Sequence, residues 1–190
     1  MQDLLSPFLF SRAPRLLLAA LLFVAMGANR SSAEIPKEYE IKAAFLYNFA
    51  KFIEWPPQRF ATETDPVVIG VLGKNPFDGE FEKIIRGRQV NGRNVVVRII
   101  VSADEARSAH LVFVSAGEED RFAAMVGALR EAAVVTVGES DRFATFGGTI
   151  TFVREGDKVR FAINLVSAEQ ARTRISSQLI KLASDVRRKP

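Results

Sequence analysis

Cysteine is absent from this chain of 190 residues, and histidine and tryptophan each occur once, as His110 and Trp55. Without cysteine the chain forms no disulfide, carries out no thiol chemistry and offers no acceptor for a lipid anchor. A lone histidine at the start of an apolar segment is typical of a structural residue, since no second ligand follows at metal spacing. We therefore expect the folded domain to be held together by its apolar core.

Sequence patterns of catalytic sites are missing as well. The chain has no Gly-x-Ser-x-Gly nucleophile motif, and Gly70 and Gly73 lack the third glycine of a dinucleotide-binding loop. Asp78, Glu80 and Glu82 are spaced like the exposed face of a helix rather than a metal cluster. The sequence thus predicts a protein that is not an enzyme and that uses no cofactor or metal.

A strong charge of one sign is also lacking. The chain carries 26 Lys and Arg against 22 Asp and Glu, a formal net charge of +4. Three of those cations and one acidic residue lie in the first 33 residues, so the remainder is close to neutral. This weak, interspersed charge argues against nucleic-acid binding.

No apolar run is long enough to span a bilayer. Arg12 and Arg15 precede an uncharged run over 16–28, which as a helix covers about 20 Å of a hydrocarbon core roughly 30 Å thick. The small residues Ser31 to Ala33 then offer a signal-peptidase site. We predict that residues 1–33 are a cleaved signal peptide, with cleavage before Glu34, and that the mature chain is exported.

The densest apolar stretch runs from Lys42 to Pro56. At about 100° per residue its apolar side chains form two adjacent stripes over close to half of a helix, with Tyr47 on the opposite side. Such a helix needs cover on more than one side, from its own sheet and from a second helix, a protomer or a partner. We expect it to end near Glu54, before two prolines. The stripes contain Ile41, Phe45, Phe49 and Phe52, and Leu46, Ala50 and Ile53.

The remaining chain alternates between strand and helix patterns. A polar cap at Ser167 and a stripe of Ala171, Ile175, Leu179, Leu182 and Val186 predict one long final helix. Parallel strands joined by helices predict a three-layer, Rossmann-like α/β domain over residues 34–190, with a mainly parallel sheet, helices on both faces and a late antiparallel hairpin. Strands are expected over 67–72, 94–101, 110–115, 134–137, 149–153 and 159–165, and helices or helical turns from 75, 102, 118 and 140.

Several polar residues interrupt apolar surroundings. Asn48, Asn164 and Gln178 either satisfy internal polar groups, as buried amides usually do, or contact a ligand. Arg172 and Arg174 lie near the start of the predicted final helix. They are either solvated or form a site for an anion or a partner carboxylate, because an arginine beside free helix N–H groups suits such a ligand.

The segment Lys42 to Pro56, KAAFLYNFAKFIEWP, resembles the signature of the YfiR family of periplasmic proteins. The resemblance extends over residues 35–186, because further motifs follow in the family's order. These are Val67 to Gly73, His110 to Val114, Val135 to Val137, Phe146 to Ile150, Phe161 to Asn164 and Ile175 to Ala183.

This resemblance implies a homodimeric periplasmic repressor. Family members bind the periplasmic domain of an inner-membrane diguanylate cyclase and so lower cyclic di-GMP output and biofilm formation. A second, outer-membrane-associated protein can sequester the repressor. Some members have a cysteine where this chain has Ala109, so redox control through disulfides does not extend to this protein.

Two functions follow from the residues and the resemblance together. The first is repression of the cyclase, for which Leu46, Ile53 and Trp55 are the expected contacts to a partner or second protomer, unless their role is purely internal. The second is a periplasmic module that binds a nucleotide or an amino acid and reports to a membrane sensor. Its expected contacts are Asn48, Asn164, Arg172, Arg174 and Gln178.

Overall fold

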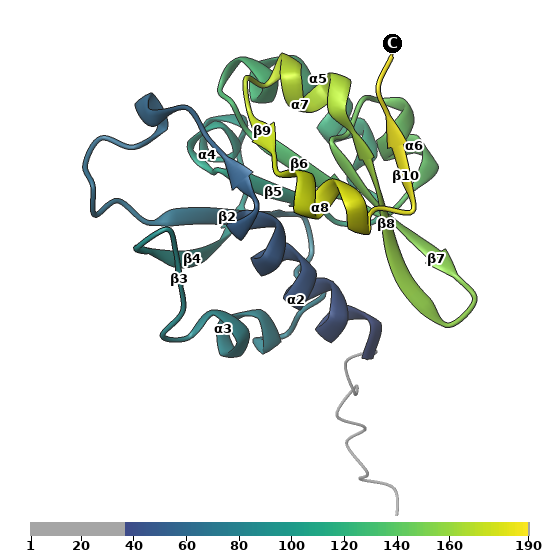
Figure 1. Cartoon of the computed structure of the whole chain (residues 1–190), viewed down its shortest axis with the longest axis horizontal. Helices are drawn as coiled ribbons and strands as arrows, with labels where there is room; N and C mark the ends of the chain where they lie inside the picture. The colour runs from purple at the N-terminus through teal and green to yellow at the C-terminus, as the bar shows by residue number, and fades with distance from the viewer. Residues whose placement is uncertain (1–36, 190) are drawn as a thin grey trace, which may run out of the picture. The chain divides into compact units, whose positions relative to one another are not determined.

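The computed structural model describes residues 37–189 (Figure 1). The predicted signal peptide, residues 1–33, lies outside them. In the described part of the chain, no helix is both long and apolar enough to span a membrane.

An eight-stranded sheet forms the centre of the fold, in the order β10-β8-β7-β6-β5-β2-β4-β3. Neighbouring strands from β4 to β7 run parallel, β7 and β8 form an antiparallel hairpin, and β10 runs parallel to β8. The predicted mainly parallel sheet with a late hairpin is confirmed. Its strands are β2 (Val67–Leu72), β3 (Gln89–Val90), β4 (Arg93–Ile100), β5 (Leu111–Val114), β6 (Val135–Gly138), β7 (Ile150–Glu155), β8 (Lys158–Asn164) and β10 (Asp185–Arg187).

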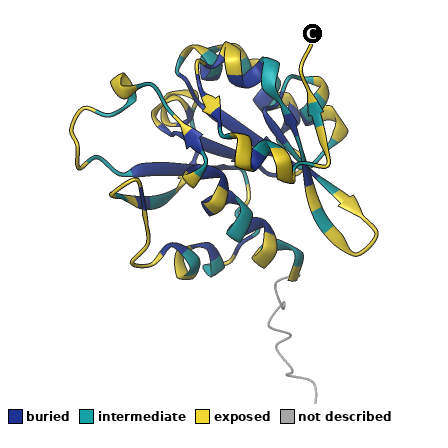
Figure 2. Cartoon of the chain, viewed as in Figure 1, coloured by how far each residue is buried: buried dark blue, intermediate teal, exposed yellow. Residues whose placement is uncertain are grey.

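Helices cover both faces of this sheet, which gives the predicted three layers. All six residues of β2 are buried, as expected of a central strand with cover on both sides (Figure 2). Val67, Ile69 and Val71 pack in one apolar cluster, whereas Val68 and Leu72 pack in a second. The first cluster includes residues of α2 (Lys37–Lys51), α3 (Glu80–Ile85) and α8 (Ser177–Leu182), and the second includes residues of α4 (Ala103–Ser108), α5 (Glu119–Glu131) and α6 (Asp141–Thr145).

Helix α2 ends earlier than the sequence predicts. It stops at Lys51, and Ile53–Glu54 form the short strand β1, which pairs with β9 (Arg174–Ile175). The expectation of a helix to Glu54 is wrong because this ribbon forms, and Ser176 N–H donates to Phe52 O at 2.9 Å. Tyr47 lies on the side of the helix opposite the apolar stripes, yet it is buried as well, and its hydroxyl donates to Gln89 O at 3.2 Å.

The single long helix predicted from Ser167 to Val186 is also wrong. The segment instead forms α7 (Leu165–Gln170), then β9, α8 and β10. Arg172 has a positive φ of 52°, which a helix does not permit, and the Ser176 side chain accepts a bond from Leu179 N–H to start α8. Ala171, Ile175 and Leu179 are buried as the stripe predicts, although they belong to different elements.

Candidate functional site

The only tryptophan and the only histidine lie against each other. The Trp55 indole N–H donates to His110 O at 3.0 Å, and the two rings meet edge to face with centroids 5.6 Å apart. His110 directly precedes β5, and its Nδ1 accepts a bond from Val68 N–H of β2 at 3.1 Å. His110 therefore connects the segment after β1 to the amino-terminal ends of the central strands β2 and β5.

Further side chains enclose the His110 ring. Phe60 stacks on it with centroids 4.5 Å apart, and the Arg93 guanidinium lies 3.9 Å from the Phe60 centroid. Burial, followed by the positive charge of Arg59, lowers the pKa of His110 from 6.5 to about 4. No residue of the described chain hydrogen-bonds to its Nε2. This buried, neutral imidazole is a structural group, as a lone strand histidine usually is.

A hollow of about 540 Å³ opens beside Trp55 and is lined by residues of two segments, 54–58 and 172–174. The ribbon of β1 and β9 holds these segments together and pairs Glu54 with Arg174 in register. An ion pair of 3.8 Å also joins those two side chains. The structure thus brings Trp55 together with Arg172 and Arg174, predicted site residues that lie far from it in the sequence.

The two arginines differ in how they are held. An Arg172 Nη donates to Glu131 O at the end of α5, at 2.6 Å. The Arg174 side chain is 83% exposed, with only the long ion pair to Glu54. Arg174 is therefore the cation at this hollow that is free to meet an incoming carboxylate or phosphate.

The other predicted contact residues do not join this site. Leu46 and Ile53 are 0% and 1% exposed and belong to the core, so Trp55 is the one of the three predicted contacts that reaches the surface. Asn164 caps α7, its side chain accepting a bond from Ser167 N–H. Asn48 and Gln178 are exposed and do not line the hollow.

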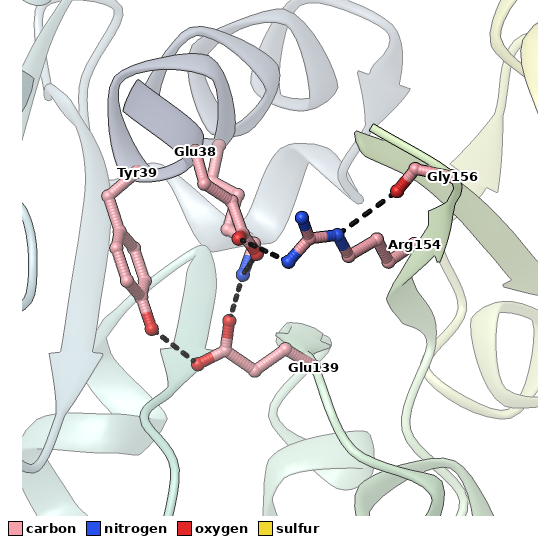
Figure 3. A network of polar contacts seen from close by, with 6 residues as sticks. Glu38, Tyr39, Glu139, Arg154 and Gly156 are labelled. Atoms are coloured by element: carbon pink, nitrogen blue, oxygen red, sulfur yellow. Dashed lines mark hydrogen bonds and ion pairs between the residues drawn. The ribbon is translucent and has the colours of Figure 1, made fainter. Parts of the chain in front are cut away.

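A second polar cluster lies at the carboxyl end of β6, where Rossmann-like folds usually bind their ligands. Figure 3 shows the Tyr39 hydroxyl pointing to the Glu139 carboxylate, which also accepts a hydrogen bond from the amino group of Lys42. The Tyr39 hydroxyl donates to this carboxylate at 3.0 Å, and Lys42 pairs with Glu139 and, at 2.6 Å, with Glu38. Arg154 of β7 lies 3.9 Å from Glu38.

This cluster is an internal connection rather than a ligand site. Lys42 is 4% exposed, so its charge is satisfied by its two carboxylate partners. Burial and the neighbouring Glu139 raise the pKa of Tyr39 to about 12, and the hydrogen bond from Lys42 lowers the pKa of Glu38. Sequence patterns do not indicate this contact, because Lys42 precedes the aromatic residues of α2 and Glu139 follows β6 without a recognisable motif.

The described residues contain no group of His, Cys, Asp or Glu side chains placed to hold a metal ion. What the hollow at Trp55 offers is an aromatic edge beside exposed positive charge. Tryptophan and arginine are the residue types most enriched in the energetic centres of protein interfaces.

A protein-family model described as YfiR/HmsC-like matches residues 39–184. The chain belongs to this family. The matched range includes α2 from Tyr39 onward, both segments of the hollow and all strands of the main sheet except β10. Membership in the YfiR/HmsC-like family supports a regulatory role in cyclic di-GMP signalling in general, and its members are periplasmic.

Comparisons with individual proteins add no functional information. No curated protein matches the chain. A conserved domain protein from Vibrio cholerae O1 biovar El Tor is 10% identical, with a TM-score of 0.48 over 78% of this chain and 60% of that one. The ABC domain from Streptococcus pneumonia in complex with L-Trp is 15% identical, with a TM-score of 0.44 over 63% and 54%. The chain spans less than two thirds of both, and likeness at this level carries no argument.

Proposed function

We propose that the protein is an exported repressor that binds the periplasmic domain of an inner-membrane diguanylate cyclase and lowers cyclic di-GMP output. Family membership supports the signalling role, and the leader over 1–33 supports export. Sequestration by an outer-membrane-associated protein, which releases the cyclase, is part of the same proposal.

The observation that carries this proposal is the convergence of Trp55, Arg172 and Arg174 at one hollow. Trp55 belongs to the family-like segment 42–56, while the arginines come from the ribbon strand β9 and the turn before it. Half-buried tryptophan beside exposed arginine suits a protein surface with an apolar group and a carboxylate. We propose this surface, the Trp55 surface, as the contact to the cyclase.

Repression places a thermodynamic requirement on this contact. A bound protein shifts the cyclase only if it binds the inactive arrangement more tightly than the active one. Equal affinity for both arrangements would leave the output unchanged, however tight the complex. The Trp55 surface must therefore recognise a feature present only in the inactive cyclase.

The test combines gene deletion with complementation. Deletion should raise cellular cyclic di-GMP, and the wild-type gene should restore it. Arg174→Glu should accumulate normally, since the Arg174 side chain is 83% exposed, but should fail to restore the low level. Lys181→Glu, at an exposed position of α8 outside the hollow, is the matched control and should restore it.

The results distinguish two claims: that the protein represses a cyclase, and that the Trp55 surface is the contact to that cyclase. If deletion leaves cyclic di-GMP unchanged, the protein is not a repressor of this kind. If Arg174→Glu complements as well as Lys181→Glu does, repression stands and the Trp55 surface is not its contact.

The same hollow supports a second candidate, a small-molecule sensor for a nucleotide or an amino acid. Its volume of about 540 Å³ lies in the range of small-molecule sites, and Arg174 would receive the phosphate or carboxylate. Because Trp55 is the only tryptophan, its fluorescence reports on this hollow directly. Saturable quenching by such a ligand, lost in Arg174→Glu, without binding to the cyclase domain, would favour the sensor.

A further inference from the structure

Residues 55–66 connect β1 to β2 and pass over the His110 ring. We call this segment the strap. Apart from the short 3-10 helix Pro57–Arg59, it contains no helix or strand. Within residues 37–189, no backbone–backbone hydrogen bond joins the strap to another segment. Side chains therefore hold the strap to the sheet, and its release does not require any strand of the sheet to unpair.

The contacts at the start of the strap converge on His110. The Trp55 indole N–H donates to His110 O, and Arg59 donates to the carbonyl oxygen of the residue before it. Trp55 also meets the His110 ring edge on, and Phe60 stacks on the face of that ring. The strap therefore keeps these contacts only while the His110 ring stays in its place.

The ring fits this place only when it is neutral. Its Nδ1 accepts a hydrogen bond from Val68 N–H at 3.1 Å. A protonated imidazole has an N–H on both nitrogens and no acceptor, so a charged His110 would direct one donor at another. His110 is 4% exposed, and a buried cation without a partner is costly. Protonation therefore favours a form in which the ring reaches water.

The charges near His110 add to this effect. Three charged groups of residues 37–189 act on the ring: Arg59 and Arg93 oppose its protonation, and Asp65 favours it. The Asp65 carboxylate is already engaged by two backbone N–H groups of the strap, at 2.7 and 3.1 Å. Arg93 also donates to two strap carbonyls, at 2.8 and 3.0 Å, so it stays close to the ring. The surroundings of His110 thus offer a proton no adequate partner.

We propose that protonation of His110 releases the strap, so that acid withdraws Trp55 from the candidate site while the sheet stays folded. A ring that leaves its place removes the aromatic contacts of both Trp55 and Phe60. Trp55 lines the hollow that contains Arg172 and Arg174, so its release alters the Trp55 surface. The effect on cyclase binding rests on the proposed function, whereas the release of the strap does not.

Two protonation equilibria determine the size of the effect. Burial, followed by the charge of Arg59, lowers the pKa of His110 from 6.5 to about 4 while the strap is in place. Once the strap is released and the ring is exposed, the pKa returns to its ordinary value. Well above pH 6.5 the ring is neutral in both forms, so acid has no effect there. Between pH 7 and pH 5 the ratio of released to bound strap rises about twentyfold.

Hydrogen exchange of the Trp55 indole N–H in the purified protein measures this ratio. Because Trp55 is the only tryptophan, its indole gives a single NMR signal. Its protection factor is obtained by comparison with free N-acetyltryptophanamide at the same pH. We expect this factor to fall about twentyfold from pH 7 to pH 5 in the wild type. In His110→Asn, whose amide oxygen can accept from Val68 N–H but does not titrate, the factor should change less than about twofold.

A second donor to the same oxygen distinguishes release of the strap from unfolding of the domain. Val135 N–H of β6 donates to His110 O at 3.0 Å and exchanges only when the sheet opens. Its protection factor should exceed that of the Trp55 indole by about tenfold or more at each pH.

Three results would overturn the inference. Equal protection factors for Trp55 and Val135 would mean that the strap opens only with the whole domain. A Trp55 factor that does not change with pH would mean that no proton controls the strap. Both of these results require only the wild type, so they hold even if His110→Asn does not fold. An equal fall in the wild type and in His110→Asn would assign the effect to another group.

The same signal tests the link to the cyclase separately. A cyclase domain that contacts the Trp55 surface binds the form with the strap in place, so adding this domain at pH 5 should raise the Trp55 protection factor. If the domain binds without changing the factor, its contact lies elsewhere on the protein. The pH dependence in the free protein would still support the release of the strap.

Discussion

At the residue scale, His110 and Trp55, the only histidine and tryptophan of the chain, connect the candidate site to the central sheet. The His110 ring accepts a hydrogen bond from Val68 N–H, and the His110 carbonyl accepts one from the Trp55 indole N–H. His110 therefore connects β2, β5 and the segment after β1. The sequence predicts a structural histidine from its position before an apolar strand. The sequence does not predict that His110 contacts Trp55, because the two residues lie 55 positions apart.

The buried imidazole should make stability depend on pH. With a folded pKa of about 4 against 6.5 when exposed, His110 is neutral in both states above pH 6.5, where its contribution is complete. As the pH falls from 6.5 to 4, the unfolded chain binds the proton first and stability declines, by up to about 3 kcal/mol. Urea unfolding followed by Trp55 fluorescence at pH 7, 6, 5 and 4.5 measures this decline.

His110→Asn is the control for that experiment, because its amide oxygen can still accept from Val68 N–H but does not titrate. Carboxylates such as Glu38 and Glu119, whose pKa values are lowered by hydrogen bonds, also reduce stability in acid and affect both proteins alike. The wild-type decline should exceed that of His110→Asn between pH 6.5 and 4.5. Parallel curves for the two proteins would show that His110 is protonated in the folded state.

The pair of Lys42 and Glu139 should contribute to stability as a unit. Their side chains are 6% and 13% exposed, so removing one leaves the other charge poorly compensated. We expect Lys42→Met to cost about 3 kcal/mol, and the double variant with Glu139→Gln to cost less than the sum of the single variants. Urea denaturation of the four proteins in the cycle measures the coupling.

Lys83→Met is the matched control, since Lys83 forms a surface pair with Glu80 in which its side chain is 63% exposed. That substitution should leave unfolding unchanged, because exposed pairs contribute little. Strict additivity in the Lys42 and Glu139 cycle would mean that the two charges are separately solvated.

At the scale of elements, the sequence predicts best those segments whose burial is uniform. Strand β2 occupies the predicted residues 67–72, because a wholly apolar run flanked by polar and glycine residues has few alternatives. The region after Ser167 was predicted poorly because Ala171, Ile175 and Leu179 keep helical spacing while the chain turns between them. The pairing of Ile53 with Ile175 causes this turn, and no local pattern encodes that contact.

Substitutions of Arg172 test whether the helix is interrupted at this residue. The test is which of two variants, glycine or alanine, is the more stable. The φ of 52° at Arg172 favours glycine, so Arg172→Gly should be more stable than Arg172→Ala by up to about 1 kcal/mol. Both variants lose the bond to Glu131 O equally, so their difference isolates the backbone. In a continuous helix the order would be reversed, with alanine more stable by about 1 kcal/mol. Thermal unfolding of both variants decides between the two.

At the scale of the whole molecule, the candidate site is assembled by topology rather than by a motif. Trp55, Arg172 and Arg174 each stand out in the sequence, but the sequence places Trp55 directly after the first helix and the two arginines in a predicted final helix far from it. Only the ribbon of β1 and β9 places them at one hollow. Leu46 and Ile53 are as apolar as Trp55 and could not be distinguished from it before the two layers that bury them were known.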